Sequence, residues 1–269
     1  MRVQTQDLSA AVDGHVVLTG VDLDLPSGGV TALVGANGSG KSTLLRTLAG
    51  IVAAPRGHVL VGGERVDRLR PRERALRMAL VAQEDSPPDD LLVGEMIALG
   101  RIPHARPWAL GGAQERQVVL RALAQVGLQD VVDRPCHALS GGERRRALLA
   151  RGLAQDAPVL LLDEPTNHLD VPHQHHLLRL VRGLGRTVVM AIHDLDLAHR
   201  YADHVVVVGE GSVLAAGPAP DVLTGEAVQR AFGIRTVTLV DPATGQAHLI
   251  CAPSDNHQAP GPVLQGDPS

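Results

Sequence analysis

Two stretches of this sequence have the residue types of a phosphate-binding helix start. Residues 35 to 42 read GANGSGKS and residues 139 to 143 read LSGGE, and a helix-like segment follows each of them. Glycines leave the first backbone amides of such a helix uncovered, and the helix dipole attracts anions to the same end. In the second stretch, Ser140 and Glu143 have the spacing of a capping box. The chain therefore carries two candidate phosphate sites, far apart along the sequence.

The first stretch follows a strand-like run and opens a helix-like one, which is the context of a P-loop. In that motif the lysine, here Lys41, reaches the β- and γ-phosphates of a nucleotide, and the hydroxyl of Ser42 can ligate Mg²⁺. We expect the nucleotide to contact a continuous set of loop and helix residues: Gly35, Asn37, Gly38, Ser39, Gly40, Lys41, Ser42 and Thr43.

Two adjacent carboxylates end the apolar run VLLLDE at residues 159 to 164. Because neighbouring side chains diverge at a strand end, the two acids can have different tasks. We expect Asp163 to hold Mg²⁺ and Glu164 to orient and deprotonate an attacking water.

The elements that must position these residues alternate between short apolar runs and helical segments, which predicts an α/β fold with a parallel sheet and crossover helices. Each apolar run ends at a charged, polar or glycine residue, and ligands of such sheets collect at the carboxyl ends of strands. The clearest predicted strands cover residues 30–35, 159–164, 187–193 and 204–209.

Three other regions have a different pattern. Residues 1–30 predict antiparallel β structure, whereas the strand signal disappears from about 84 to 138 and helix-like segments replace it. In the segment QERQVVLRALAQVGL, apolar residues fall at helical spacing at Val118, Ala122, Leu123 and Val126. We predict a helical insertion over about 84–155, a C-terminal β-like extension over 236–253 and a disordered tail over 254–269.

Composition narrows the class of protein. The chain has 269 residues, 44% of them hydrophobic, and a formal net charge of −4, so it is expected to be a soluble globular protein that binds no nucleic acid. Its 2 cysteines make a disulfide framework improbable. The start MRVQTQDLSAAVDG lacks the pattern of a signal peptide, and no apolar run approaches the roughly 20 residues that span a bilayer. We expect a cytoplasmic protein; if it serves a membrane, another polypeptide crosses it.

Six motifs in register resemble the nucleotide-binding subunits of ATP-binding cassette (ABC) transporters, over roughly residues 1–235. They are Walker A at 35–42, the glutamine of VAQ at 83, LSGGE, Walker B at 159–164, NHLD at 167–170 and AIHD at 191–194. The resemblance implies an ATPase that uses ATP and Mg²⁺. It also implies a P-loop core with an antiparallel β subdomain and an inserted helical subdomain.

Partner subunits and further site residues are implied by the same resemblance. Subunits of this family pair head to tail, so Ser140, Gly141 and Gly142 are expected to meet the partner's nucleotide. Ser140 and Gly142 are expected to bind its γ-phosphate. Gln83 resembles the glutamine that touches Mg²⁺ and the attacking water, and His193 the histidine that contacts the γ-phosphate and the catalytic glutamate. Asp170 resembles the aspartate that couples the two sites.

Further stretches resemble the importer branch that handles iron–siderophore complexes, haem and cobalamin: GRIPH at 100–104, TNHLD, HDLDLAHRYADHVVVV and VDPATGQAHLI. This implies a homodimer at the cytoplasmic face of the membrane, working with two polytopic permease subunits and an external substrate-binding protein. Ferric siderophores are the favoured cargo. A soluble ABC-type ATPase without transport is the alternative, although such proteins carry two cassettes or a long coiled coil. A P-loop kinase or motor would lack LSGGE and the switch histidine.

Three features leave alternatives open. The family stacks an aromatic residue on adenine where this chain has Val12, and His15 could stack less strongly. The segment NHLDVPHQHH holds four histidines, which are expected to be surface residues, with metal binding as the alternative. The three arginines that follow LSGGE are expected to form a solvated helix face, unless one of them supports the phosphate region: Arg144, Arg145 and Arg146.

Overall fold

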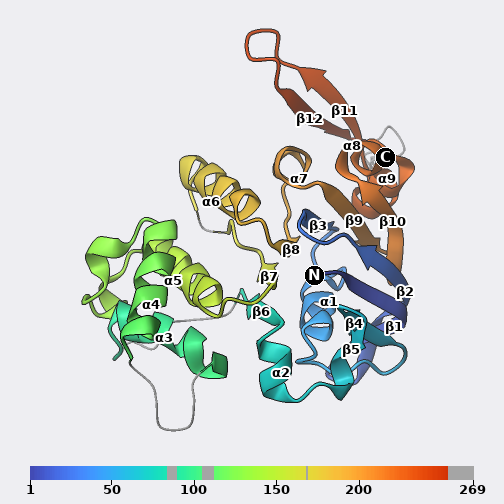
Figure 1. Ribbon diagram of the computed structural model, residues 1–269. Coiled ribbons are helices and arrows are strands. Elements are labelled where there is room, and N and C mark those ends of the chain that lie inside the picture. The colour runs from blue at the N-terminus through green and yellow to red at the C-terminus, as the bar shows by residue number, and fades with distance from the viewer. Residues whose placement is uncertain (84–89, 105–111, 168, 254–269) are drawn as a thin grey trace, which may run out of the picture.

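A computed structural model describes residues 1–83, 90–104, 112–167 and 169–253. The predicted tail over 254–269 and the first six residues of the predicted insertion lie outside the described residues. Figure 1 shows a central sheet with helices α3 to α5 gathered at one side, a small N-terminal sheet at the other, and a C-terminal hairpin projecting away from both.

The central sheet runs in the order β10-β9-β3-β8-β7-β6. The five strands from β9 to β6 are parallel, and β10 pairs antiparallel with β9. Four of them are buried along almost their whole length, as expected for strands covered on both faces. The strands are β3 (Val30–Val34), β6 (Met78–Val81), β7 (Val159–Asp163), β8 (Thr187–Ala191), β9 (His204–Gly209) and β10 (Ser212–Pro218).

The predicted parallel sheet is thus confirmed, with one difference at the end of β7. The strand expected over 159–164 ends at Asp163, because Glu164 has φ 49° and so leaves the extended conformation. Its side chain therefore turns away from the line of the strand, toward the site described below.

The N-terminal sheet is antiparallel, in the order β2-β1-β4-β5, as the first 30 residues predict. Asp13 and Gly14 join its first two strands, and both have positive φ, as a tight two-residue hairpin requires. Its strands are β1 (Val3–Val12), β2 (His15–Leu25), β4 (His58–Val61) and β5 (Glu64–Arg65).

Helices connect and cover these strands. The helix α1 (Lys41–Leu48) follows β3 directly, while α3 to α5 make the helical insertion. Of the predicted apolar face of α4, Ala122, Leu123 and the following Val126 are buried, whereas Val118 is half-buried and its neighbour Val119 is buried instead. The other helices are α2 (Pro71–Ala75), α3 (Val93–Ala98), α4 (Ala113–Gln125), α5 (Gly141–Ala154), α6 (Val171–Gly183), α7 (Leu195–Tyr201), α8 (Ala219–Leu223) and α9 (Glu226–Phe232).

The helical insertion shares its hydrophobic core with the sheet. Met96 of α3, Leu123 of α4 and Leu149 of α5 belong to the same buried cluster as Leu162 of β7 and Met190 of β8. The opposite face of the sheet packs with α1 and the N-terminal strands in a second cluster. Alternate residues of each strand enter different clusters, so a register slip of one residue would exchange the two faces.

The β-like segments predicted near the C-terminus form an antiparallel hairpin, β11 (Ile234–Val240) with β12 (Ala247–Pro253). The expected boundary at 235 falls inside β11. The hairpin is attached to the body through α7, where the amide of Leu249 donates to Asp196 Oδ1 at 2.9 Å. No helix within the described residues is long and apolar enough to cross a membrane.

Candidate active site

The loop between β3 and α1 has the backbone geometry of a phosphate cradle. Gly38 and Gly40 have φ of 77° and 99°, in the left-handed region that favours glycine. At Gly35, a Cβ would lie 2.3 Å from the carbonyl oxygen of Val208 and 2.6 Å from Ser39 Oγ, so only glycine fits there. The Ser39 hydroxyl is buried and has no hydrogen-bond partner among the described residues. An unpaired buried hydroxyl in a glycine-rich loop is what a ligand with acceptor oxygens would satisfy.

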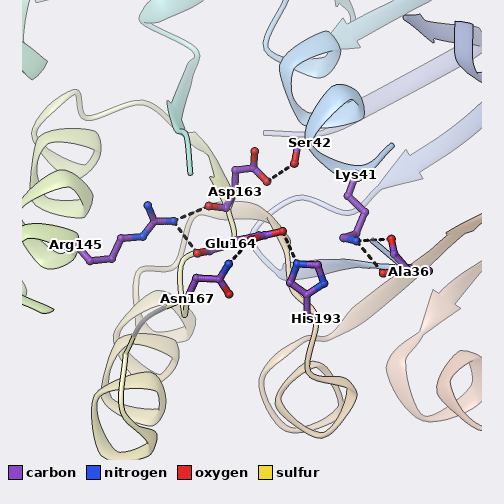
Figure 2. A network of polar contacts seen from close by, with 9 residues as sticks. Ala36, Lys41, Ser42, Arg145, Asp163, Glu164, Asn167 and His193 are labelled. Carbon is purple, nitrogen blue, oxygen red and sulfur yellow. Dashed lines mark hydrogen bonds and ion pairs between the residues drawn. The ribbon is translucent and has the colours of Figure 1, made fainter. Parts of the chain in front are cut away.

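Lys41 lies over this loop at the start of α1. Its Nζ donates to the carbonyl oxygens of Gly35 at 2.8 Å and Ala36 at 3.0 Å (Figure 2). Burial lowers the pKa of Lys41, and the nearby charges of Glu164 and Asp163 oppose that shift. The amine is therefore held in the cleft by its own loop, close to the place where a phosphate would enter.

Asp163 and Ser42 meet where β7 ends beside the start of α1. The Ser42 hydroxyl donates to Asp163 Oδ1 at 2.9 Å. Burial raises the pKa of the Asp163 carboxyl above its usual value; the hydrogen bond from Ser42 opposes the shift and the charge of Glu164 adds to it. Two of the three predicted metal ligands, Ser42 and Asp163, are thus in direct contact.

The Glu164 side chain is buried and held on both sides. One carboxylate oxygen contacts Nε2 of His193, which follows β8, and the other accepts from Nδ2 of Asn167 (Figure 2). The positive φ of Glu164 is uncommon for a residue with a side chain, and such strain is kept where the surrounding contacts fix it. Neither the role of Asn167 nor this backbone conformation was expected from the sequence, although Asn167 lies within the NHLD motif.

A cleft of about 730 Å³ brings the predicted residues of one chain together. Gln83, which follows β6, is exposed and lines this cleft. Gly35 and Asp163 do not line it but bond to residues that do, Lys41 and Ser42. The lining residues are Val12, Val17, Asn37, Gly38, Ser39, Gly40, Lys41, Ser42, Thr43, Gln83, Glu164, Asn167 and His193.

Among the described residues, no Phe, Tyr or Trp lines the cleft where adenine would be expected to stack. Val12 and Val17 occupy that wall, and Val12 is 45% exposed. His15 pairs with Val12 across the hairpin but is exposed and is not part of the lining. The wall is therefore aliphatic.

Ser140, Gly141 and Gly142 are not part of this cleft. Ser140 caps α5 in the predicted capping box: its Oγ accepts from the amide of Glu143 at 3.3 Å, and its own amide donates to Glu143 Oε2 at 2.9 Å. The hydrogen bonds that the Ser140 amide and then its hydroxyl donate to the Glu143 carboxylate lower the pKa of Glu143. The second candidate phosphate site is therefore formed but lies outside the cleft that the phosphate loop of its own chain lines.

Asp170 is also outside the cleft, at the N-cap of α6. Its carboxylate accepts from the amide of His173 at 3.2 Å and contacts the ring of the same histidine, which lowers the pKa of Asp170. His175 instead contacts the Tyr201 hydroxyl at 2.8 Å. His168 lies outside the described residues, and among the described ones no group of three or more His, Cys, Asp or Glu side chains could hold a metal ion.

The expected solvated arginine face after LSGGE is wrong at Arg145. Its guanidinium turns into the protein and donates to the carbonyl oxygens of Asp163 at 2.6 Å and Glu164 at 2.7 Å (Figure 2). The Nε atoms of Arg144 and Arg146 are buried as well. The next turn of α5, from Ala147 on, is buried in the core, and this places Arg145 against the carboxyl end of β7.

Comparison with known proteins shows the family of this chain. A family model described as ABC transporter matches residues 18–167. The chain belongs to the ABC transporter family. It is therefore an ATPase whose hydrolysis of ATP is coupled to transport.

Among the relatives of this ABC protein, the ferric enterobactin transport ATP-binding protein FepC of Escherichia coli is 36% identical over 91% of this chain and 92% of its own length. The cobalamin import ATP-binding protein BtuD of Halobacterium salinarum is 43% identical over 91% of this chain, which spans 62% of that protein. A solved ATP-binding cassette, dimeric in a post-hydrolysis state with ADP and Pi, has a TM-score of 0.73 at 25% identity, covering 81% of this chain and 98% of its own.

Proposed function

We propose that this protein is the ATP-hydrolysing subunit of an ABC importer for ferric siderophore complexes, driven by ATP-dependent closure and reopening of a homodimer. The observation that carries the hydrolytic part is the Glu164 carboxylate, held between His193 and Asn167 in the same cleft as Lys41. A carboxylate fixed beside a phosphate-binding amine is suited to accept a proton from a water that attacks the γ-phosphate.

Each residue of the cleft has a separate task in this proposal. Lys41 exchanges its bonds to the loop carbonyls for the β- and γ-phosphate oxygens. Glu164 orients the attacking water and takes its proton. His193 contacts the γ-phosphate and keeps the Glu164 carboxylate turned toward it. Charge on the phosphates is thus met by groups that are already in place, which is the main source of catalysis in phosphoryl transfer.

The residues that would hold Mg²⁺ offer oxygen donors of the kind it prefers: the hydroxyl of Ser42, the carboxylate of Asp163 and the amide of Gln83. Bound there, the ion would neutralise charge on the β- and γ-phosphates. The raised pKa of Asp163 fits this assignment, because a buried carboxylate close to Glu164 gains most from a cation.

The position of LSGGE supports a shared site. Ser140, Gly141 and Gly142 form a helix start that is exposed or half-buried and lies outside the cleft of its own chain. In a head-to-tail homodimer they would meet the partner's nucleotide, with Ser140 and Gly142 at its γ-phosphate, and Asp170 would couple the two sites. Hydrolysis would then remove the contact that holds the dimer closed.

Mixed dimers test this arrangement. Lys41→Ala removes the lysine of the phosphate loop in one chain, and Ser140→Arg blocks the helix start of the other. In a mixed dimer the intact phosphate loop of the second chain meets the intact helix start of the first, which gives one complete site. A dimer of either variant alone has none. The mixture should regain ATP-dependent association in analytical ultracentrifugation. A mixture that associates no better than the two separate, folded variants would contradict the shared site.

In the membrane part of the proposal, the dimer lies at the cytoplasmic face and binds two polytopic permease subunits. An external substrate-binding protein delivers the cargo to these subunits. Two relatives whose names are transport or import ATP-binding proteins support it. Purification of the tagged protein from membranes should yield a polytopic subunit. Uptake in cells lacking this chain, measured for a ferric siderophore, haem and cobalamin in parallel, should fail for the siderophore. Loss of haem uptake alone, or of cobalamin uptake alone, would identify that compound as the cargo in place of a ferric siderophore. A protein that binds no membrane subunit would indicate the soluble ABC-type ATPase.

A further inference from the structure

One guanidinium joins three elements of this protein that take part in the reaction. Arg145 lies on α5, and its Nη2 donates to the carbonyl oxygens of Asp163 and Glu164, at 2.6 Å and 2.7 Å. Its Nη1 donates to the carbonyl oxygens of Ala82 and Gln83, at 3.3 Å and 3.4 Å. One side chain thus joins the end of β7, the segment after β6 and α5, the helix that Ser140 caps.

The geometry suits a rigid clamp. A guanidinium presents its donors in a fixed planar fork, and bonds from a charged donor are roughly twice as strong as neutral ones. These four hydrogen bonds of Arg145 all end on backbone oxygens, and its side chain does not line the cleft. Arg145 can therefore act on the reaction through the residues whose carbonyls it holds.

Glu164 is the residue most affected by this clamp. Its backbone is in the left-handed region, and its amide donates to the carbonyl of Ala191 on β8 at 3.2 Å. Ala191 of β8 holds the amide side of this residue, and its carbonyl accepts from Arg145 at 2.7 Å and from the amide of Asn167 at 3.3 Å, so the direction of its Cα–Cβ bond is fixed. Without the bond from Arg145, the peptide could relax toward a commoner backbone conformation and turn the carboxylate away from His193.

We propose that Arg145 is a positioning residue for ATP hydrolysis. By binding the carbonyl oxygens of Glu164 and Gln83, it fixes the positions of both residues relative to α5, the helix that Ser140 caps. In the dimer this links a chain's contact with the partner's nucleotide to the catalytic carboxylate of its own site. That last link rests on the proposed function; the positioning of Glu164 within one chain does not.

The first test compares Arg145→Gln with Arg144→Gln, the same loss of charge one residue earlier on α5. The Nε of Arg144 has no hydrogen-bond partner among the described residues. Arg145→Gln should lower kcat about 10- to 100-fold, the range expected when a reacting group is displaced by about an ångström, while KM, ATP affinity and the thermal midpoint stay near wild type. Arg144→Gln should keep kcat. An unchanged kcat in Arg145→Gln, or an equal loss in Arg144→Gln, would overturn the proposal.

A second test separates positioning from general stability. If Arg145 acts through Glu164, then adding Arg145→Gln to Glu164→Gln should slow single-turnover hydrolysis no further, because the group being positioned is already inactive. Multiplying losses would show that Arg145 acts by another route. Arg145→Gln alone should also accumulate an ATP-bound dimer, since its Ser140 helix start is intact and only hydrolysis is slowed.

Arg145→Lys covers the case in which the glutamine variant does not fold. An ammonium cannot span both pairs of carbonyls as the fork does, so its kcat should fall between those of wild type and Arg145→Gln, with ATP affinity retained. A lysine variant with wild-type kcat would refute the clamp. Failure of the proposed function has a different signature: the wild-type protein itself would then show no ATPase activity or no ATP-dependent dimer.

Discussion

Glu164→Gln is the most direct test of the chemistry in the cleft. The change replaces one carboxylate oxygen by an amide of the same shape. The remaining oxygen can still accept from Asn167, and the new NH₂ group can donate to His193 when Nε2 of that ring is unprotonated. The side chain should therefore stay in place, and the loss should be confined to its ability to take a proton.

The magnitude follows from that single loss. General base catalysis contributes about 10²- to 10⁴-fold in rate, which is roughly 3–5 kcal/mol of barrier at about 1.4 kcal/mol for each factor of ten. Lys41 and Ser42 keep their contacts, so ATP binding should be unchanged. The prediction is a fall in kcat of that size without loss of ATP affinity.

Three measurements check it: phosphate release at saturating ATP, equilibrium ATP binding, and size-exclusion chromatography with and without ATP. Bound ATP should persist in the variant and hold a dimer that the wild type releases. Glu64→Gln is the matched control, because it makes the same chemical change at a carboxylate whose side chain is 60% exposed and paired with Arg77. A Glu164→Gln protein that stays monomeric with ATP and turns over normally would refute Glu164 as the base.

Further changes in and around the cleft have expected outcomes of their own. Burial raises the pKa of Asp163, so its ionised form lowers the free energy of unfolding at neutral pH, and this destabilisation fades as the pH falls through the raised pKa. Asp163→Asn should therefore raise the urea midpoint of the nucleotide-free protein near pH 7. The difference in urea midpoint from wild type should disappear in acid. Val12→Tyr should tighten ATP binding and sharpen the ATP/GTP ratio in titrations, by at most the 1–3 kcal/mol or so that base stacking contributes elsewhere; an unchanged ratio would show that adenine is already held. Gly35→Ala, whose Cβ would meet Val208 at 2.3 Å, should abolish ATP binding and destabilise the fold by about 1–3 kcal/mol, whereas Gly183→Ala, with nothing within 4 Å, should not, as thermal melts would show.

Local spacing was enough to predict much of this structure. The capping box of Ser140 and Glu143 depends on residues three apart, and the structure confirms it. Lys41, Glu164 and His193 come from distant segments, but each follows a predicted parallel strand, and such strands end at one edge of a sheet. Their meeting in one cleft could therefore be predicted without coordinates.

Other features depend on packing that no local pattern encodes. Three consecutive arginines look alike in sequence, and only the placement of α5 against the ends of β6 and β7 directs Arg145 inward. The left-handed backbone of Glu164 has no signature in the sequence either. A charged residue after an apolar run could equally well extend the strand by one residue. That conformation separates the Glu164 side chain from the line of the strand and lets it reach His193.

The continuous hydrophobic cluster described above has a consequence for how the chain unfolds. Since the buried residues of α3, α4 and α5 are part of the same cluster as those of β7 and β8, the helical insertion is not an independent folding unit. Opening it would expose the covered face of the sheet at the same time. The insertion and the sheet should therefore melt in one cooperative transition, and the slowest-exchanging amides of α5 should have the same opening free energy as those of the central strands.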